Sequence, residues 1–320
     1  MLDRVRRLRS ENIIRQVSAI FDTKSLGYRS SLVAMKVPPD RIGEAARIIN
    51  EHPGVTHNYE RNHEYNLWFT VAVPPTSDLE AVVRRMHELA GGIDTRVMYT
   101  LKLFKIGVDL DMKGDRPADA RSKPEYSEPD RLRAEQHQFT NRDIAVLREL
   151  QEDLPAVAEP FAPMADRLGC SQAELFAEVQ DLVRRGFLRR FAAILYHRRA
   201  GFKSNGMGVW KVPEEQIAEI GPIMASFKAV SHCYQRPTYP DWPYTVFTMV
   251  HGNSDEQCEE ILAAIARETG VHEYLSLYSS REYKKTRLRY FAPEMAAWEA
   301  KYMRGTEATH GNVAEHAGVS

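Results

Sequence analysis

The sequence aligns with itself when it is displaced by 174 to 178 residues, and this internal repeat restricts the fold more than any other feature. One match places His57-x-Tyr59-x-Arg61 on His232-x-Tyr234-x-Arg236. Four more keep the same order along the chain: Ile14-Arg15-Gln16 with Leu188-Arg189-Arg190, Gly27-Tyr28 with Gly201-Phe202, Met35-Lys36-Val37-Pro38 with Trp210-Lys211-Val212-Pro213, and Phe69-Thr70 with Phe247-Thr248. Five matches in register indicate two copies of one unit. The offset grows by three residues between the last two matches, which predicts a longer loop in the second copy.

Hydropathy periodicity predicts the same order of elements in each copy. In the first copy the order is strand 31–37, helix 41–51, strands 55–61 and 65–73, helix 78–90 and strand 95–106. In the second copy it is strand 206–212, helix 214–227, strands 230–236 and 244–250, helix 255–269 and strand 273–281. The order βαββαβ is that of the ferredoxin-like fold, so we expect an α+β protein with two such domains in tandem.

A winged helix-turn-helix is predicted before the second domain. Segments 141–152 and 160–168 read as helices, and Ser171 with Glu174 forms a capping box for a third helix that runs to Arg185. A strand at 187–195 supplies the wing. The first copy retains only the end of this module, so we expect a truncated remnant there.

The predicted organisation has six parts. They are a remnant of the winged helix and wing at 1–30, a ferredoxin-like domain at 31–106, a linker at 107–139, the winged helix-turn-helix at 140–200, a second ferredoxin-like domain at 201–291 and a tail at 292–320. The linker holds eight Asp and Glu, six Lys and Arg and three Pro residues, which is typical of a solvated connection.

Composition excludes several classes of protein. Lys and Arg number 43 against 44 Asp and Glu, and this balance argues against a protein that mainly binds phosphate backbones. No apolar run approaches the ~18 residues of a membrane span, and the basic N-terminus lacks the apolar stretch of a secretory signal. Three cysteines without a CxxC pair indicate neither a disulfide framework nor a cysteine zinc site. We therefore expect a cytoplasmic protein with no membrane partner.

The helix that would read DNA has the wrong charge for that task. It exposes Glu174, Glu178 and Asp181, and its only basic residues are Arg184 and Arg185. Carboxylates repel a phosphate backbone, whereas base reading requires Arg, Lys, Asn or Gln. We therefore do not expect DNA binding.

The repeated His-Tyr-Arg triplet indicates chemistry. Strand period two places His57, Tyr59 and Arg61 on one face, where an ordinary half-buried strand carries aliphatic residues. The second copy repeats this pattern at His232, Tyr234 and Arg236. An imidazole serves as a general acid or an iron ligand near neutral pH, and a guanidinium clamps a carboxylate.

These residues resemble the siroheme decarboxylases, a family related to the Lrp/AsnC regulators. One subunit type of that family is similar to Gly54-Val-Thr-His57-Asn-Tyr-Glu-Arg61-Asn-His63-Glu-Tyr65-Asn66-Leu-Trp68-Phe69-Thr70. The other subunit type is similar to Ser231-His232-Cys-Tyr234-Gln-Arg236-Pro-Thr-Tyr-Pro-Asp-Trp242-Pro243-Tyr244. Supporting matches are Gly206-Met207-Gly208-Val209-Trp210-Lys211-Val212-Pro213 and Arg281-Glu-Tyr283-Lys284-Lys285-Thr-Arg287-Leu-Arg-Tyr290-Phe291. The resemblance covers about 14–106 and 140–291 and departs from the family in the missing N-terminal helices.

The resemblance implies an enzyme that removes the carboxyl groups of the C12 and C18 acetate side chains of siroheme. The product is 12,18-didecarboxysiroheme, in siroheme-dependent haem biosynthesis, and the enzyme is a carboxy-lyase. The two unlike subunits of the family stand here in one chain, so the halves pair as a pseudo-dimer within the chain or between chains of a homo-oligomer. No cofactor is expected beyond the iron tetrapyrrole substrate, because the reaction has no net electron change.

The resemblance and the chemistry together assign candidate roles. His57 and His232 are the candidate general acids, and either of these or His63 is a candidate axial ligand of the substrate iron. Arg61 and Arg236 are the first candidates to bind the carboxylates, and Tyr59 and Tyr234 orient the histidines, bind a carboxylate or simply pack. Further candidates for substrate binding are His63, Arg189, Arg190, Lys203, Lys284, Lys285 and Arg287.

Two other functions remain open. An Lrp/AsnC-type transcriptional regulator that senses haem or another small molecule would bind promoter DNA in a salt-sensitive way. A non-catalytic tetrapyrrole carrier would bind siroheme without turnover.

Overall fold

The computed structural model describes residues 2–107, 117, 119–121, 138–195 and 204–303, so most of the predicted linker, the end of the tail and Lys203 lie outside the described residues. The first copy contains α1 (Leu2–Ser10), β1 (Ile14–Phe21), β2 (Arg29–Lys36), η1 (Pro39–Arg41), α2 (Ile42–Asn50), β3 (Val55–Arg61), β4 (Leu67–Val73), α3 (Leu79–Ala90), β5 (Asp94–Met98) and β6 (Lys102–Ile106). The second contains α5 (Asn141–Leu150), α6 (Ala162–Leu168), α7 (Gln172–Arg184), β7 (Leu188–Leu195), β8 (Ser204–Trp210), η3 (Glu214–Gln216), α8 (Ile217–Ser226), β9 (Val230–Gln235), β10 (Val246–Gly252), α9 (Asp255–Thr269), β11 (Tyr274–Lys285) and α10 (Pro293–Tyr302). The predicted α+β class is confirmed.

The two ferredoxin-like units share one sheet. Within the described residues its nine strands follow the order β5-β2-β4-β3-β11-β8-β10-β9-β6. Strand β11 makes the junction, because Tyr274–Tyr278 pairs with β8 of its own copy and Ser279–Lys285 pairs with β3 of the other. The two copies therefore pair within one chain through main-chain hydrogen bonds.

The predicted single strand 95–106 is wrong, because the structure divides it. Strand β5 pairs with β2 of its own copy, whereas β6 pairs with β9 of the second copy. The edge of β9 needs a partner for its backbone groups, and β6 supplies it. Each copy thus extends its last strand into the other copy.

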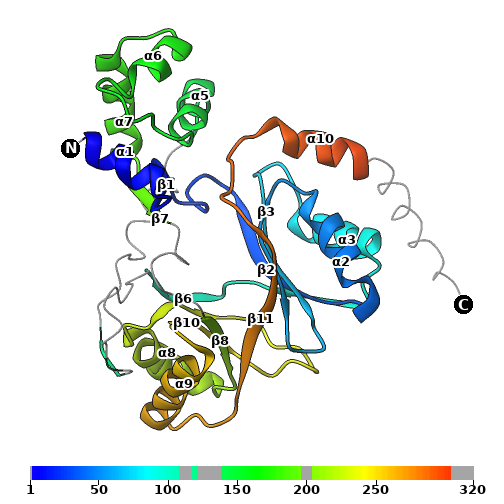
Figure 1. The fold of residues 1–320 in the computed structure, drawn as a ribbon. Coiled ribbons are helices and arrows are strands. Elements are labelled where there is room, and N and C mark those ends of the chain that lie inside the picture. Colours follow the sequence, from blue (N-terminus) through cyan, green and yellow to red (C-terminus); the bar gives the residue numbers. More distant parts are fainter. Residues whose placement is uncertain (1, 108–116, 118, 122–137, 196–203, 304–320) are drawn as a thin grey trace, which may run out of the picture.

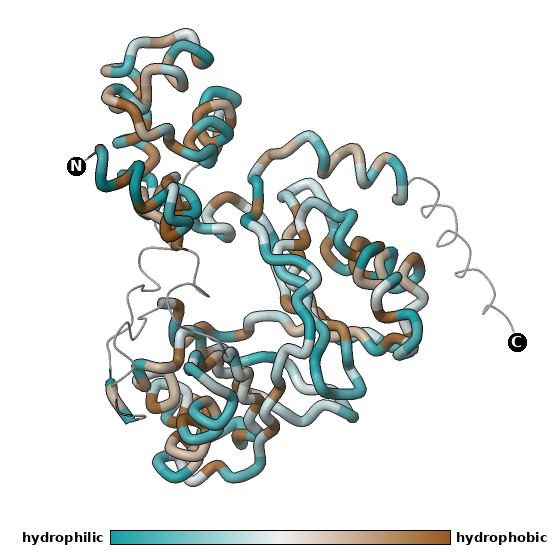
Figure 2. Tube along the Cα trace, in the orientation of Figure 1, coloured by the Kyte–Doolittle hydropathy of each residue, from teal (hydrophilic) through white to brown (hydrophobic). Residues whose placement is uncertain are grey.

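Helices cover one face of the sheet in each copy (Figure 1). Asp78 caps α3 by accepting hydrogen bonds from Glu80 and Ala81, and Gly91 ends the helix in the left-handed conformation. Helices α2 and α3 bury Ile49 and Val82, among others, against the first half of the sheet. Helices α8 and α9 do the same over the second half. In Figure 2 the strands at the middle, where β3 and β11 meet, carry mainly hydrophilic residues.

The N-terminal segment completes the winged helix instead of forming a second one. Strand β1 pairs with β7, so each copy contributes one strand of a separate two-stranded sheet. Leu26 and Tyr28 of the first copy join the same core as Leu147 and Leu182 of the helices. Capping boxes start α5 at Thr140 and α7 at Ser171, as the sequence predicts for α7.

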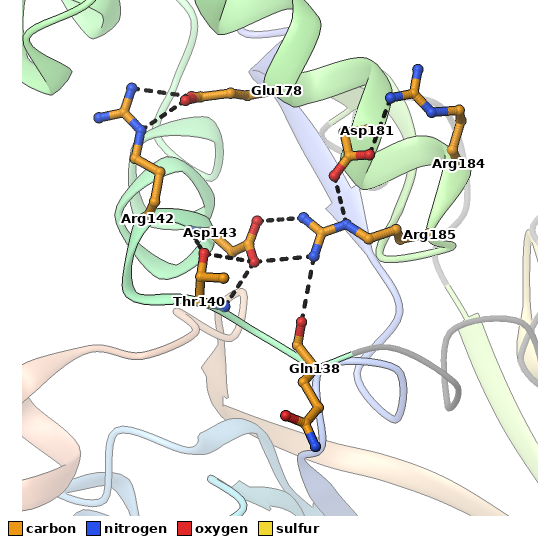
Figure 3. Close-up of polar contacts among 8 residues, drawn as sticks. All are labelled: Gln138, Thr140, Arg142, Asp143, Glu178, Asp181, Arg184 and Arg185. Atoms are coloured by element: carbon orange, nitrogen blue, oxygen red, sulfur yellow. Dashed lines mark hydrogen bonds and ion pairs between the residues drawn. The ribbon is translucent and has the colours of Figure 1, made fainter.

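The charged residues of α7 are paired inside this module (Figure 3). Glu178 accepts hydrogen bonds from Arg142, and Asp181 forms ion pairs with Arg184 and Arg185. Arg185 also contacts Asp143 of α5. Arg184 and Arg185, the basic residues available to contact phosphate, therefore form ion pairs with carboxylates of the same module.

The segment predicted as a tail from residue 292 begins with a helix. Helix α10 packs on the first copy, where Trp298 is 6% exposed and its ring centroid lies 4.5 Å from that of His52. Met295, Trp298 and Tyr302 share one helical face at spacings of three and four, a pattern that the tail prediction overlooked.

The cysteines carry free thiols, as the sequence predicts. Cys233 and Cys258 are buried and Cys170 is half-buried. Of the helices that the structure describes, none has both the length and the apolar character to cross a membrane.

The crossing of β6 can be tested at Gly221, which packs under the Phe104 ring. A Cβ on Gly221 would overlap three atoms of that ring, so Gly221→Ala must shift the ring and disturb the packing of β6 against α8. We expect a loss of about 1–3 kcal/mol in the free energy of unfolding, measured by urea denaturation. Gly43→Ala is the matched control, because this helical glycine has nothing within 4 Å of its Cβ position, and the change should stabilise by up to about 1 kcal/mol. Equal stabilities for the two variants would contradict the packing described.

Candidate functional site

Strand parity turns both triplets away from the helices. Asn58, in the middle of the first triplet, donates hydrogen bonds to the Ala46 carbonyl (3.3 Å) and Asn50 (2.9 Å) on α2. His57, Tyr59 and Arg61 therefore lie on the opposite face. Cys233 fixes the second triplet in the same way, since its Sγ contacts the Gly221 carbonyl of α8 at 3.7 Å.

The helix-free faces of the two copies meet around one cavity of about 320 Å³. The structure brings both predicted triplets together in its wall. The lining residues are Leu32, His57, Tyr59, Arg61, Trp68, Phe69, Thr70, Asn205, Met207, His232, Tyr234, Arg236, Phe247, Thr248, Met249, His251, Ser279 and Lys285. A cavity lined by equivalent residues of both halves requires the pseudo-dimer.

The longer loop of the second copy, predicted from the offset, contacts the first copy through Asp241 and Trp242. Its Trp242 is fully buried, with its ring centroid 5.5 Å from that of Trp68. Asp241 lies 2.5 Å from the Tyr65 hydroxyl and 3.1 Å from Arg96, both of the first copy. The loop thus ties the second half to the first.

The two arginines of the triplets are buried cations, each hydrogen-bonded to a main-chain carbonyl of the other copy. Arg61 donates to the Leu277 carbonyl at 2.8 Å, and Arg236 donates to the Met98 carbonyl. They are 6% and 7% exposed, and neither forms an ion pair with a carboxylate in the part of the chain that the structure describes. Within that part their Nε atoms also have no hydrogen-bond partner. Burial lowers the pKa of each to about 10, so both stay charged at neutral pH and suit an anionic ligand.

The tyrosines stand between the histidines and the arginines. The ring centroids of His57 and Tyr59 are 6.1 Å apart, and those of His232 and Tyr234 are 6.0 Å apart. Arg236 lies 4.7 Å from the centroid of Tyr234. Burial raises the pKa of Tyr234 to about 12, against the opposing charge of Arg236, so its neutral hydroxyl is available as a donor.

Each histidine is oriented by the hydroxyl of the residue before it. Nδ1 of His57 lies 3.0 Å from Thr56 Oγ1, and Nδ1 of His232 lies 2.8 Å from Ser231 Oγ. Burial lowers the pKa of His232 to about 4, and the positive charges of Arg236 and Lys105 act in the same direction. His232 is therefore neutral at pH 7. The described residues contain no group of three or more His, Cys, Asp or Glu side chains arranged to hold a metal ion.

Of the basic residues predicted on β11 and after it, only Lys285 lines the cavity. Lys284 points to the other face, where its Nζ donates to the Asn50 carbonyl at 2.8 Å. Arg287 donates to the Ser18 hydroxyl and to the Ala19 carbonyl (2.9 Å) of β1. Neither Lys284 nor Arg287 therefore lies in the cavity wall, because adjacent residues of a strand face opposite sides and the turn after it carries Arg287 to β1.

None of the remaining candidates that the structure describes is among the residues that line the cavity. His63 is in the hairpin turn, with its ring centroid 5.3 Å from that of Trp242, and is not among the lining residues. Arg189 forms an ion pair with Asp22 at 3.3 Å, and its charge also acts on Tyr234. Arg190 is exposed on β7. Lys203 lies outside the described residues.

Sequence reasoning missed His251 and Asn205. With the repeat offsets, His251 aligns with Val73 and Asn205 with Ser30, so neither is shared by the copies and the repeat did not mark them. For His251 the available signal was local: it is a histidine near the end of a strand otherwise made of Val, Phe, Thr, Met and a final Gly.

Two family models match the chain. A model described as AsnC-like ligand binding domain matches residues 25–105 and 199–284, and one described as siroheme decarboxylase NirDL-like HTH domain matches residues 143–189. The first match covers both ferredoxin-like units, and the second covers the helical module.

Similar proteins cover nearly the whole chain. A siroheme decarboxylase of Hydrogenobacter thermophilus is 41% identical over 299 residues, which is 93% of this chain and 87% of the relative. A siroheme decarboxylase beta subunit of Methanosarcina barkeri is 45% identical over 46% of this chain and 97% of the subunit. A crystal structure of the siroheme decarboxylase NirDL in co-complex with an iron-uroporphyrin III analogue has a TM-score of 0.74 and 36% identity, and the match covers 94% of this chain and 87% of that one.

The electrostatics of the cavity predict an unusual titration for His232. Its imidazole should stay neutral as the pH falls from 7 and gain its proton only near pH 4, which NMR of the ring protons measures. In Arg236→Leu the pKa should rise part of the way toward 6.5, because burial remains the larger cause. The equivalent change Arg61→Leu is the control and should leave His232 unchanged. Titration of His232 near 6.5 in the native protein would contradict the described burial.

Proposed function

The chain belongs to the siroheme decarboxylase family, and from this premise we propose that its cavity binds siroheme and removes the carboxyl groups of the C12 and C18 acetates. The product is 12,18-didecarboxysiroheme, which serves siroheme-dependent haem biosynthesis. Both reactions break a carbon–carbon bond without hydrolysis or oxidation, so the enzyme is a carboxy-lyase. We place this reaction in the cytoplasm, in keeping with the three free thiols.

The observation that carries the proposal is the pair of buried arginines, one from each copy, in one cavity wall. Desolvated cations without a counter-charge are costly, and an anionic ligand offsets that cost. Arg61 and Arg236 therefore bind carboxylates of the tetrapyrrole, with Lys285 beside them. The apolar side chains of the wall, such as Trp68 and Phe247, contact the macrocycle.

The chemistry needs a proton donor and no electron acceptor. Loss of CO₂ leaves an electron pair on the side-chain methylene, delocalised into the macrocycle, and one proton completes the methyl group. His57 and His232 line the cavity and deliver these protons as N–H donors. The electron count does not change, so no cofactor is used beyond the iron that arrives within the substrate.

The histidines have a second possible role that the proposal includes. A neutral imidazole such as that of His232 also suits axial ligation of the substrate iron, and His57 is the equivalent candidate. His63 is the weaker candidate, because it packs against Trp242 outside the cavity wall. Tyr59 and Tyr234, whose rings lie beside the histidines, orient them and donate to a carboxylate.

Activity on siroheme is the primary test. Purified protein incubated anaerobically with siroheme should yield a product two CO₂ units lighter by mass spectrometry. His57→Ala and His232→Ala should each reduce the rate by about 10²–10⁴-fold, the usual range for general acid catalysis. His272→Ala, at an exposed position outside the cavity, is the control and should match the unaltered protein.

Bound but unchanged siroheme would instead favour a carrier, and salt-sensitive binding to promoter DNA would favour a regulator. Full activity in both cavity variants would show that other groups supply the protons. If the absorption spectrum of bound siroheme changes in only one of these two variants, the histidine replaced in that variant is the iron ligand.

The arginines should determine affinity. A hydrogen bond to a charged group contributes about 1.5–3 kcal/mol, so Arg61→Ala and Arg236→Ala should weaken siroheme binding roughly tenfold to a hundredfold in an optical titration. Arg47→Ala changes an exposed arginine on α2 and is the control. Unaltered affinity in both cavity variants would rule out carboxylate binding by these side chains.

A further inference from the structure

The two halves of the cavity differ in the residues that hydrogen-bond to the triplet histidine. We propose that His251 is a proton-relay residue that passes a proton to His232 through Ser231. This inference rests on the proposed function, because it concerns the proton that replaces CO₂. His251 acts through another residue, so it is a positioning and relay group and not a catalytic residue.

A continuous chain of hydrogen bonds joins the two histidines. His232 Nδ1 lies 2.8 Å from Ser231 Oγ, and the same oxygen lies 2.6 Å from His251 Nε2. His251 Nδ1 lies 2.5 Å from Asn205 Oδ1. Each contact is within hydrogen-bonding distance. The imidazoles and the serine hydroxyl can each donate or accept a proton, and the Asn205 amide oxygen accepts a hydrogen bond from His251.

The chain leads from the interior toward the surface. Ser231 is 2% exposed, His251 is half-buried and Asn205 is exposed. The pKa of His232 lies far below neutrality, so its imidazole is neutral at pH 7 and must take up a proton for each one that it donates. The imidazole of His251, which is nearer to solvent, can take up that proton and pass it inward.

The chain has two fully hydrogen-bonded arrangements. In the charged one, His251 donates from Nδ1 to Asn205 and from Nε2 to Ser231, and the Ser231 hydroxyl donates to His232 Nδ1. His232 then carries its proton on Nε2. In the neutral one, Ser231 donates to His251 Nε2 and accepts from His232 Nδ1–H. Serine suits both because its hydroxyl is both donor and acceptor.

Passage between the two arrangements accounts for one decarboxylation. The bond to the carboxyl carbon breaks, CO₂ leaves, and the electron pair stays on the methylene carbon. The Nε2 proton of His232 forms the new C–H bond, the Ser231 proton moves to Nδ1, and the Nε2 proton of His251 moves to Ser231. His251 changes from cation to neutral, and solvent later restores one proton to the chain.

The first copy lacks this extension. His57 contacts Thr56 at 3.0 Å, and Thr56 Oγ1 lies 2.8 Å from Thr70 Oγ1. Val73 occupies the position equivalent to His251, and Ser30 the position equivalent to Asn205. The relay is therefore a property of the second half, and the two decarboxylations should depend on it unequally.

The experiment follows the two CO₂ losses separately in single turnover, with the full chain, siroheme and anaerobic quenching. In His251→Gln one step should slow by about tenfold or more, so that a species one CO₂ lighter than siroheme accumulates, while the dissociation constant stays within twofold. Ser231→Ala should behave likewise. Ser231→Thr restores the hydroxyl that the first copy carries at this position and should recover most of the rate. His272→Gln is the matched histidine control.

The outcomes separate the relay from the function on which it rests. An unaltered protein that releases no CO₂ overturns the proposed function. An active protein whose His251→Gln variant performs both steps at the normal rate overturns the relay alone. Equal slowing of both steps, or slowing that follows lost siroheme affinity, also overturns it, because a merely structural role predicts those results.

Discussion

The site depends on main-chain pairing between the two copies. Strand β6 completes the edge of β9, and β11 joins β8 to β3, so neither half has a finished sheet without the other. Each arginine also donates to a main-chain carbonyl of the other copy, Arg61 to Leu277 and Arg236 to Met98. Backbone hydrogen bonds thus position both the walls of the cavity and the charges within it.

Those charges favour an anionic ligand in the cavity. A buried guanidinium that donates to a single carbonyl keeps part of its hydrogen-bonding capacity for a ligand, and its desolvation penalty favours an anion over water. Two such groups, one in each half, match a flat molecule with carboxylates around its edge. The balanced net charge of the chain conceals this local arrangement.

Duplication made the halves alike, and later differences made them unequal. The loop with Asp241 and Trp242 exists at this length only in the second copy, and it binds Tyr65 and Trp68 of the first. His251 stands where the first copy has Val73. Comparison of the copies predicted the longer loop, because an insertion shifts the offset. It missed His251, because a residue present in one copy leaves no repeated signal.

The sequence alone determined the βαββαβ order, the capped helices and the faces of the triplets, because hydrophobic period, capping residues and strand parity are local properties. Only the tertiary structure decided which copy each last strand joins, because the hydropathy pattern of β6 does not depend on the strand with which it pairs. It likewise decided that Lys285 faces the cavity while Lys284 holds the end of α2. Both lysines are equally basic in the sequence, and their separation follows from strand register, which long-range pairing sets.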